Sequence, residues 1–348
     1  MANSLSLDDR IDIELYALFL ISGKKDKGRS SLHEFGLDAV SSAVATAIAR
    51  SVVAPFDRVK IISQVHYTSV NGQNNSHYHP GILTTLNQIY REQGLRALWF
   101  GNATNILRFV PSQAVMFGLN TFYLKLLLGN IKHKDDGFSH VALSLISGGL
   151  SGATTLCIFY PLLFCQTHLA AHVGPLVDRE YTGLLDCIQK TVQTRGVRAL
   201  YTGFAIAANG MVINKAIYFG AYYSFNKTIL DHNNSLIFNK EKDAKLPFWI
   251  RFATAQVATY LSQLFSYPLD TIGRVLIVQT SQEEKLYQNA RDCFSKLWNS
   301  QGLSGLYRGM LPNIIRSSGS ALILVLHDEF KWILSKTGML FKNENQDD

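Results

Sequence analysis

The chain has 348 residues, of which 47% are hydrophobic and 17% are charged, and its 33 Lys and Arg against 26 Asp and Glu give a net charge of +7. This composition is too apolar for a nucleic-acid-binding protein and fits a membrane protein beside anionic lipid. The four cysteines show no CxxC spacing, so neither a disulfide framework nor a zinc site is predicted.

Residues 1–35 form an N-terminal extension outside the repeated part of the chain. Their apolar segment, Ile11–Ile21, lies among the acidic residues Asp8, Asp9, Asp12 and Glu14, so it does not resemble an Arg-rich, acid-poor transit peptide. The segment is also too short to cross a bilayer. We interpret it as a segment that docks on the membrane surface or on a partner protein, with a disordered tail as the alternative.

Six apolar stretches of membrane-spanning length follow the extension. None is a clean run of apolar residues, because small, polar and basic residues interrupt each one. Such interruptions are typical of a polytopic membrane protein with a polar interior, whose inward faces need not be apolar. The expected helices are 36–64, 102–129, 139–170, 204–231, 247–279 and 310–337.

A proline recurs near the end of the first, third and fifth of these helices. Pro55, Pro161 and Pro268 stand 106 and 107 residues apart, so one unit occurs three times, as residues 36–131, 138–232 and 246–337, before a polar tail of residues 338–348. Proline kinks a helix, and Asp57 and Lys60 share one helix face after the first kink. Three such kinks around an axis can close a pore, whereas one copy would be only a surface ion pair.

Each repeat also has a short amphipathic helix between its two long helices. These helices are expected at Ile82–Glu92, Leu184–Thr194 and Ala290–Asn299. A glycine follows each, as is common at helix ends, and an aromatic-x-Gly turn then precedes the second long helix. The glycines are Gly94, Gly196 and Gly302 after the short helices, and Gly101, Gly203 and Gly309 in the turns.

Together, the prolines, the turns and the tripled unit resemble the mitochondrial carrier family over residues 36–337, and within it the ADP/ATP carriers. Similar stretches include Ala54-Pro-Phe-Asp-Arg-Val-Lys60, Leu169-Ala-Ala-His-Val-Gly174 and Ser266-Tyr-Pro-Leu-Asp-Thr271. The resemblance implies an all-α protein with six transmembrane helices in three pseudo-symmetric repeats, which form a barrel in the mitochondrial inner membrane.

The resemblance also places a substrate site on the inward faces of the helices. Arg50, Arg108 and Arg316 would hold phosphate groups, because guanidinium suits phosphate oxygens and arginine is costly inside a bilayer. We expect no acidic partner for them at the same depth, which favours an anionic ligand; the alternative is that they pair with internal carboxylates or backbone groups. The other expected substrate-binding residues are Gly210, which would leave room for a flat base, Met211, Asn214 and Ser266.

In the family, a gate on the matrix side closes by ion pairs. The acidic residue that follows each of the three prolines pairs with the basic residue that follows the next proline. The expected pairs here are Asp57 with Gln166, Leu163 with Gly273, and Asp270 with Lys60. Only the last pair keeps both charges. Arg274 stands one position late, about 100° round the helix, and is not expected to replace Gly273.

The gate on the cytoplasmic side has lost more of its charges. Its expected positions are Thr121, Leu124, Tyr223, Asn226, Asp328 and Lys331. Only the third repeat keeps an acid and a base, Asp328 and Lys331, and neither would meet an opposite charge in a neighbouring repeat. Because alternating access needs two closed states of comparable free energy, unequal loss of the two gates should bias the barrel toward one conformation.

Two functions are compatible with these residues. The first is exchange of adenine nucleotides or a related phosphorylated anion by alternating access. The second is a transport-inactive carrier fold that serves as a structural subunit of a larger inner-membrane assembly, such as a respiratory-chain complex. The central arginines favour the first, whereas the lost gate charges and the N-terminal extension favour the second.

No catalytic or metal site is expected. The sequence offers no nucleophile, metal cluster or phosphate loop, so an enzyme, a cofactor and a nucleic-acid partner are not predicted. His77 and His79 lie in a polar loop and are expected to be solvated rather than metal-bound. The family resemblance implies cardiolipin at the short-helix N-termini, where backbone amides receive phosphate; Gly183 fits this role, and Phe100 replaces a base at the first site.

Overall fold

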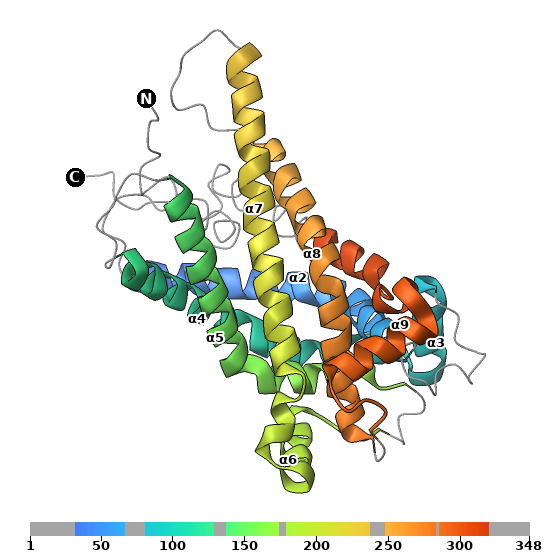
Figure 1. Ribbon diagram of the computed structural model, residues 1–348. Helices are drawn as coiled ribbons and strands as arrows, with labels where there is room; N and C mark the ends of the chain where they lie inside the picture. The colour runs from blue at the N-terminus through green and yellow to red at the C-terminus, as the bar shows by residue number, and fades with distance from the viewer. Residues whose placement is uncertain are drawn as a thin grey trace.

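The computed structural model of the chain (Figure 1) describes residues 32–66, 81–128, 137–173, 179–236, 248–282 and 285–319. Within these ranges the regular elements are all helical, which confirms the all-α prediction. The long helices are α2 (Leu32–His66), α4 (Asn102–Leu128), α5 (Gly137–Ala171), α7 (Phe204–Leu236), α8 (Phe248–Val278) and a final helix that begins at residue 310 and is described to residue 319. The short elements are α3 (Ile82–Gln93), α6 (Leu184–Arg195), α9 (Ala290–Leu306), and the 3₁₀ turns η2 (Leu95–Trp99), η4 (Val197–Tyr201) and η5 (Gln279–Ser281).

The short helices lie where the sequence predicts them, with one difference. The helices α3 and α6 end within a residue of the expected positions, whereas α9 continues from Ala290 to Leu306. Its backbone breaks at Gly302, which has a φ of 63°. This break separates two helices, so the helix that begins at Ala290 ends at the glycine as predicted, and the difference is the short second helix that follows it to Leu306; glycine tolerates the positive φ that the break requires.

The first long helix of each repeat contains its proline without ending there. Pro55, Pro161 and Pro268 lie inside α2, α5 and α8. In Figure 1, α4 runs beside α5 and α7 beside α8, and both pairs are in contact. The second long helix of one repeat therefore packs on the first long helix of the next.

The aromatic-x-Gly turns close the bundle into a ring. Each turn glycine has a φ near +80° and packs closely against a backbone carbonyl of the following repeat. A methyl group on Gly101 would lie 3.0 Å from the Gln166 carbonyl oxygen, one on Gly203 would lie 3.0 Å from that of Gly273, and one on Gly309 would lie 2.9 Å from that of Lys60. Because the third contact returns to the first repeat, the three repeats surround a common axis.

A tyrosine beside the proline supports this turn in two repeats. The hydroxyl of Tyr160 donates to the Thr202 carbonyl at 2.8 Å, and that of Tyr267 donates to the Arg308 carbonyl at 2.9 Å. Both acceptors immediately precede the turn glycine. The tyrosines therefore fix the second long helix of a repeat to the kink of the first.

Replacing Gly309 with alanine should lower the free energy of unfolding by about 1–3 kcal/mol, because the methyl group would meet backbone and the residue would keep an unfavourable φ. Gly94 is the matched control, since its φ of +81° is close to the +79° of Gly309 but no neighbouring atom lies within 4 Å of its Cβ position. Thermal unfolding in detergent micelles tests both variants. Equal losses of stability in the two alanine variants would show that backbone strain alone, and not the contact with Lys60, destabilises the Gly309 variant.

Membrane-spanning character is unevenly distributed over the described helices. Ile146–Ala171 in α5, with a mean hydropathy of 1.4, is long and apolar enough to cross a bilayer alone. Among the other described helices, α6 is long and apolar enough only when it is joined to Val197–Tyr222, from which a bend of 119° separates it. The other long helices contain polar and charged residues. Those in α2 include Arg50, Asp57 and Lys60, which face neighbouring helices rather than lipid.

Candidate functional site

The expected ion pair between α2 and α8 is present. Lys60 Nζ lies 2.8 Å from Asp270 Oδ2, and the Lys60 side chain is only 8% exposed. The carboxylate also accepts a hydrogen bond from Gln64 Nε2 at 3.2 Å and lies 3.2 Å from Arg274 Nε on its own helix. Asp270 therefore balances two cations, and Arg274 reaches it rather than the neighbouring repeat.

Asp57 has a different partner from the one that the sequence predicts. Its Oδ1 lies 3.2 Å from Arg316 Nε on the final helix, and its Oδ2 accepts a weak hydrogen bond from Asn105 at 3.4 Å. Both charged side chains are less than one-fifth exposed. The prediction that the central arginines have no acidic partner is therefore wrong for Arg316, because this arginine of the final helix reaches the carboxylate after the kink of the neighbouring helix α2.

The expected partner of Asp57, Gln166, is connected to it through two residues of α4. Arg108 Nε donates to Gln166 Oε1 at 3.1 Å, and its terminal nitrogen donates to Asn105 Oδ1 at 3.2 Å. Since Asn105 in turn contacts Asp57, polar contacts join α5, α4, α2 and the final helix. At this position of the matrix-side gate, Asn105 and Arg108 of α4 therefore take the place of the base that is missing at Gln166.

The third expected pair, Leu163 with Gly273, has no charge on either side. Leu163 packs beside the apolar cluster between α5, α6 and α7. A methyl group on Gly273 would lie 3.4 Å from Ile206 and 3.9 Å from Ala207, so the N-terminal turn of α7 approaches α8 closely. Apolar packing thus takes the place of an ion pair at this position.

Arg50 differs from the other two central arginines. Its guanidinium lies over the ring of Phe109, 3.7 Å from the ring centre. It makes no hydrogen bond or ion pair with any residue that the structure describes, although Arg316, Asp57 and Arg108 are near enough to interact with its charge. Among the described residues, its hydrogen-bonding edge is therefore open to a ligand.

Positive charge exceeds negative charge in this centre. Five cationic side chains (Arg50, Lys60, Arg108, Arg274 and Arg316) surround two carboxylates (Asp57 and Asp270), an excess of three positive charges among the described residues. A cluster of buried and half-buried cations with too few carboxylates is suited to binding an anion.

Comparison with known proteins agrees with this architecture. The family described as "Mitochondrial carrier protein" matches residues 32–130, 138–233 and 244–338. The chain belongs to the mitochondrial carrier family. Members of this family are transporters rather than enzymes, and the match supports the six-helix, three-repeat fold.

Similar curated proteins include ADP/ATP translocases. ADP/ATP translocase 4 of Bos taurus is 36% identical over 313 residues, which cover 90% of this chain and 93% of the relative. ADP/ATP translocase 2 of Tachyglossus aculeatus aculeatus is 36% identical over 300 residues, covering 85% and 97%, and ADP/ATP translocase 3 of Sus scrofa is 34% identical over 303 residues, covering 86% and 98%.

Gly210 and Met211, two of the residues predicted to bind substrate in this mitochondrial carrier, lie at helix interfaces. A methyl group on Gly210 would lie 3.2 Å from Leu269 Cβ, so the missing side chain allows α7 to approach α8 closely, and a role of this glycine in binding a base stays a prediction. Met211 points to the opposite neighbour, with its sulfur 3.0 Å from a methyl group built on Gly152 of α5. The physical reason is the rotation of α7, which directs both positions at adjacent helices.

Asn214 and Ser266 are bonded to each other. Asn214 Nδ2 donates to Ser266 Oγ at 3.0 Å and lies 3.3 Å from Ser262 Oγ, while Ser266 Oγ donates to the Ser262 carbonyl at 2.9 Å. These bonds fasten α7 to α8. A substrate contact at either residue would have to compete with them, and their role in binding stays a prediction.

The predicted cytoplasmic gate of this carrier is only partly described. Thr121 is exposed and Leu124 is half-buried on α4. Tyr223 and Asn226 lie on α7, but their side chains are outside the described part of the structure, as are residues Asp328 and Lys331. The N-terminal segment Ile11–Ile21, the loop with His77 and His79, and the tail 338–348 are outside it too.

Sequence reasoning missed the asparagines that orient two of the arginines. Asn105 stands three residues before Arg108, and Asn313 stands three residues before Arg316, from which it accepts a hydrogen bond at 3.0 Å. The signal was present, because Asn-x-x-Arg recurs in the first and third repeats and residues three apart share a helix face. Phe109, which supports Arg50, had no comparable signal.

Proposed function

We propose that this carrier exchanges adenine nucleotides, or a related phosphorylated anion, across the mitochondrial inner membrane by alternating access. The supporting observation is the excess of cationic side chains at the centre of the bundle, above all Arg50, whose hydrogen-bonding edge has no partner among the described residues. The relatives named as ADP/ATP translocases support the same substrate class. Cardiolipin at the short-helix N-termini remains part of this proposal.

The three arginines would bind phosphate at different costs in existing contacts. Arg50 can bind phosphate without giving up a hydrogen bond to any described residue, since its contact in that part of the chain is an aromatic face. Arg108 and Arg316 would exchange their bonds to Gln166 and Asp57 for bonds to phosphate oxygens. Guanidinium groups bind phosphate in a planar, forked geometry, so this exchange replaces one charge-assisted bond with another.

Substrate binding would thereby loosen the end of the bundle where the proline kinks meet. The chain of contacts from Gln166 through Arg108 and Asn105 to Asp57 depends on the same arginines that would bind phosphate. A ligand can shift a conformational equilibrium only by binding one state better than the other. Competition for these arginines gives the ligand that preference, and the Lys60–Asp270 pair would be the remaining ionic closure.

The test is exchange of labelled ADP and ATP by the purified chain in cardiolipin-containing liposomes. Saturable exchange is expected, and the Arg108→Ala, Arg316→Ala double variant should reduce it about 100-fold or more, because two charge-assisted bonds are lost. Arg198→Ala is the matched control, since Arg198 is exposed on η4 and should leave exchange unchanged. Absence of exchange by the folded wild-type chain would contradict the proposal.

A structural subunit of a larger inner-membrane assembly is the second candidate. The observation that favours it is the loss of charge from two of the three matrix-side pairs, together with the bonds that fasten α7 to α8 at Asn214. Such a barrel could hold a nucleotide or lipid without cycling. Co-purification of stoichiometric inner-membrane proteins from mitochondria, combined with no exchange in liposomes, would favour this function, with the N-terminal extension as the docking segment.

A further inference from the structure

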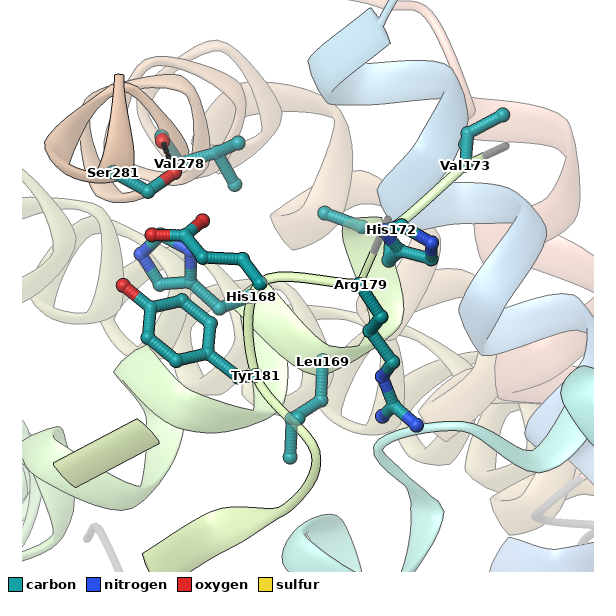
Figure 2. A pocket seen from close by; sticks show the side chains of 10 residues that line it. His168, Leu169, His172, Val173, Arg179, Tyr181, Val278 and Ser281 are labelled. Atoms are coloured by element: carbon teal, nitrogen blue, oxygen red, sulfur yellow. Dashed lines mark hydrogen bonds between the residues drawn. The ribbon is translucent and has the colours of Figure 1, made fainter. Parts of the chain in front are cut away.

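The pocket that Figure 2 shows lies apart from the proposed substrate site. It has a volume of about 160 Å³ at the C-terminal ends of α5 and α8, and none of the five central cations lines it. The Arg179 side chain on its wall is directed away from His168, so these two polar groups extend in different directions. Another group of polar side chains, between α8 and the final helix, does reach a central cation.

Gln263 of α8 connects this group to Arg316. Its Oε1 accepts a hydrogen bond from Asn313 Nδ2 at 2.8 Å, and its Nε2 donates to Ser317 Oγ at 2.8 Å. Asn313 Oδ1 in turn accepts from Arg316 Nη2 at 3.0 Å. Asn313 is only 2% exposed, so its side chain depends on these two neighbours for its hydrogen bonds.

The directions of these hydrogen bonds follow from Ser317. Its hydroxyl donates its one proton to the Asn313 backbone carbonyl at 2.9 Å, so it can only accept from Gln263. The Gln263 amide must then present its NH₂ group to Ser317 and its oxygen to Asn313. Asn313 donates to that oxygen, which leaves its own side-chain oxygen for Arg316. Gln263 thus holds the Asn313 amide in the orientation that accepts from the arginine.

The first repeat fixes the equivalent amide with a carboxylate. Asn105 Nδ2 donates to Asp57 at 3.4 Å, and Asn105 Oδ1 accepts from Arg108 at 3.2 Å. In the third repeat the carboxylate at the corresponding position is Asp270, which is paired with Lys60. A different side chain of α8 therefore orients the asparagine of the third repeat.

The position of Gln263 in its repeat is that of Arg50 in the first. Each stands five residues before the proline of its helix. Equivalent positions of a repeat that surrounds an axis lie at similar depth, so Gln263 borders the centre in which phosphate would bind. Its contact with Asn313 confirms that it faces the final helix, to which Arg316 belongs.

We propose that Gln263 is a positioning residue of the substrate site, which acts through Asn313 to hold Arg316 in the orientation that binds phosphate. This inference rests on the proposed function. When phosphate displaces Asp57 from Arg316, the contact with Asn313 would remain and keep the direction of the guanidinium. An arginine held in this way loses less conformational freedom on binding than an unsupported one.

Equilibrium binding of labelled ADP to the full chain in cardiolipin-containing micelles tests the proposal. Gln263→Met nearly keeps the volume of the side chain but removes its amide, so the ADP affinity should fall about 10-fold. In an Arg316→Ala background the same change should have no further effect, because Gln263 acts only through this arginine. Gln256→Met on the same helix is the matched control and should leave the affinity unchanged, since Gln256 makes no hydrogen bond with a described residue.

Thermal unfolding of each variant without ADP separates positioning from a purely structural role. A lower unfolding temperature of Gln263→Met with an unchanged ADP affinity would overturn the proposal. So would an equal loss of affinity in the wild-type and Arg316→Ala backgrounds, which would indicate that Gln263 contacts ADP directly. If the wild-type chain binds no ADP, the proposed function fails and this inference fails with it, whereas ADP binding that is insensitive to Gln263→Met overturns the inference alone.

Discussion

Arg58→Ala is expected to lower the free energy of unfolding by about 3–5 kcal/mol, because it leaves several buried acceptors without a donor. The Arg58 side chain is 1% exposed, and its guanidinium donates to the carbonyls of Ala97, Ala170 and His172 and to Gln93 Oε1. Two of these carbonyls lie at the C-terminal end of α5, where a cation is also favoured by the helix dipole. One side chain thus fastens the first repeat to the second.

Thermal unfolding of the purified chain in micelles measures this loss. Arg58→Lys keeps the charge but not the forked set of donors, so it should recover only part of the stability. Arg198→Ala, on the exposed surface of η4, should stay within about 0.5 kcal/mol of the wild type. If Arg58→Lys is as stable as the wild type, charge at this position suffices and the individual hydrogen bonds contribute little.

Asp57→Asn should have opposite effects on the free and the nucleotide-bound chain. Without nucleotide, Arg316 loses its carboxylate while Arg50 and Arg108 remain nearby, which should cost about 2–4 kcal/mol of stability. With nucleotide, the phosphate no longer has to displace Asp57, so affinity should rise about 10-fold. Unfolding temperatures measured with and without ADP report both changes.

Asp270→Asn is the matched control for this variant. It neutralises the other central carboxylate, which pairs with Lys60 and Arg274 rather than with Arg316. It should lower stability without the same gain in nucleotide affinity. Equal gains in the two variants would indicate a general effect of net charge, and an unchanged affinity in Asp57→Asn would exclude competition between Asp57 and phosphate for Arg316. If ADP stabilises neither variant nor the wild type, the structural-subunit function is favoured.

The sequence was sufficient for the features that depend on neighbours along the chain. The prolines, the short helices and the turn glycines recur at a nearly constant period, and each has a local physical meaning that holds in all three copies. The period also predicted the pair of Lys60 with Asp270, 210 residues apart, because equivalent positions around an axis must face each other.

The tertiary structure decided which way the central side chains point. Whether Gly210 faces a cavity or Leu269, and whether Arg316 meets a ligand or Asp57, depends on the rotation of each helix about its own axis and on the reach of a long side chain. One residue position corresponds to about 100° of rotation, so a pattern that identifies a helix does not fix its contacts to that accuracy. Sequence therefore determined the repeat, the helices and one ionic contact, whereas packing of helices distant in the chain determined the partners of the arginines.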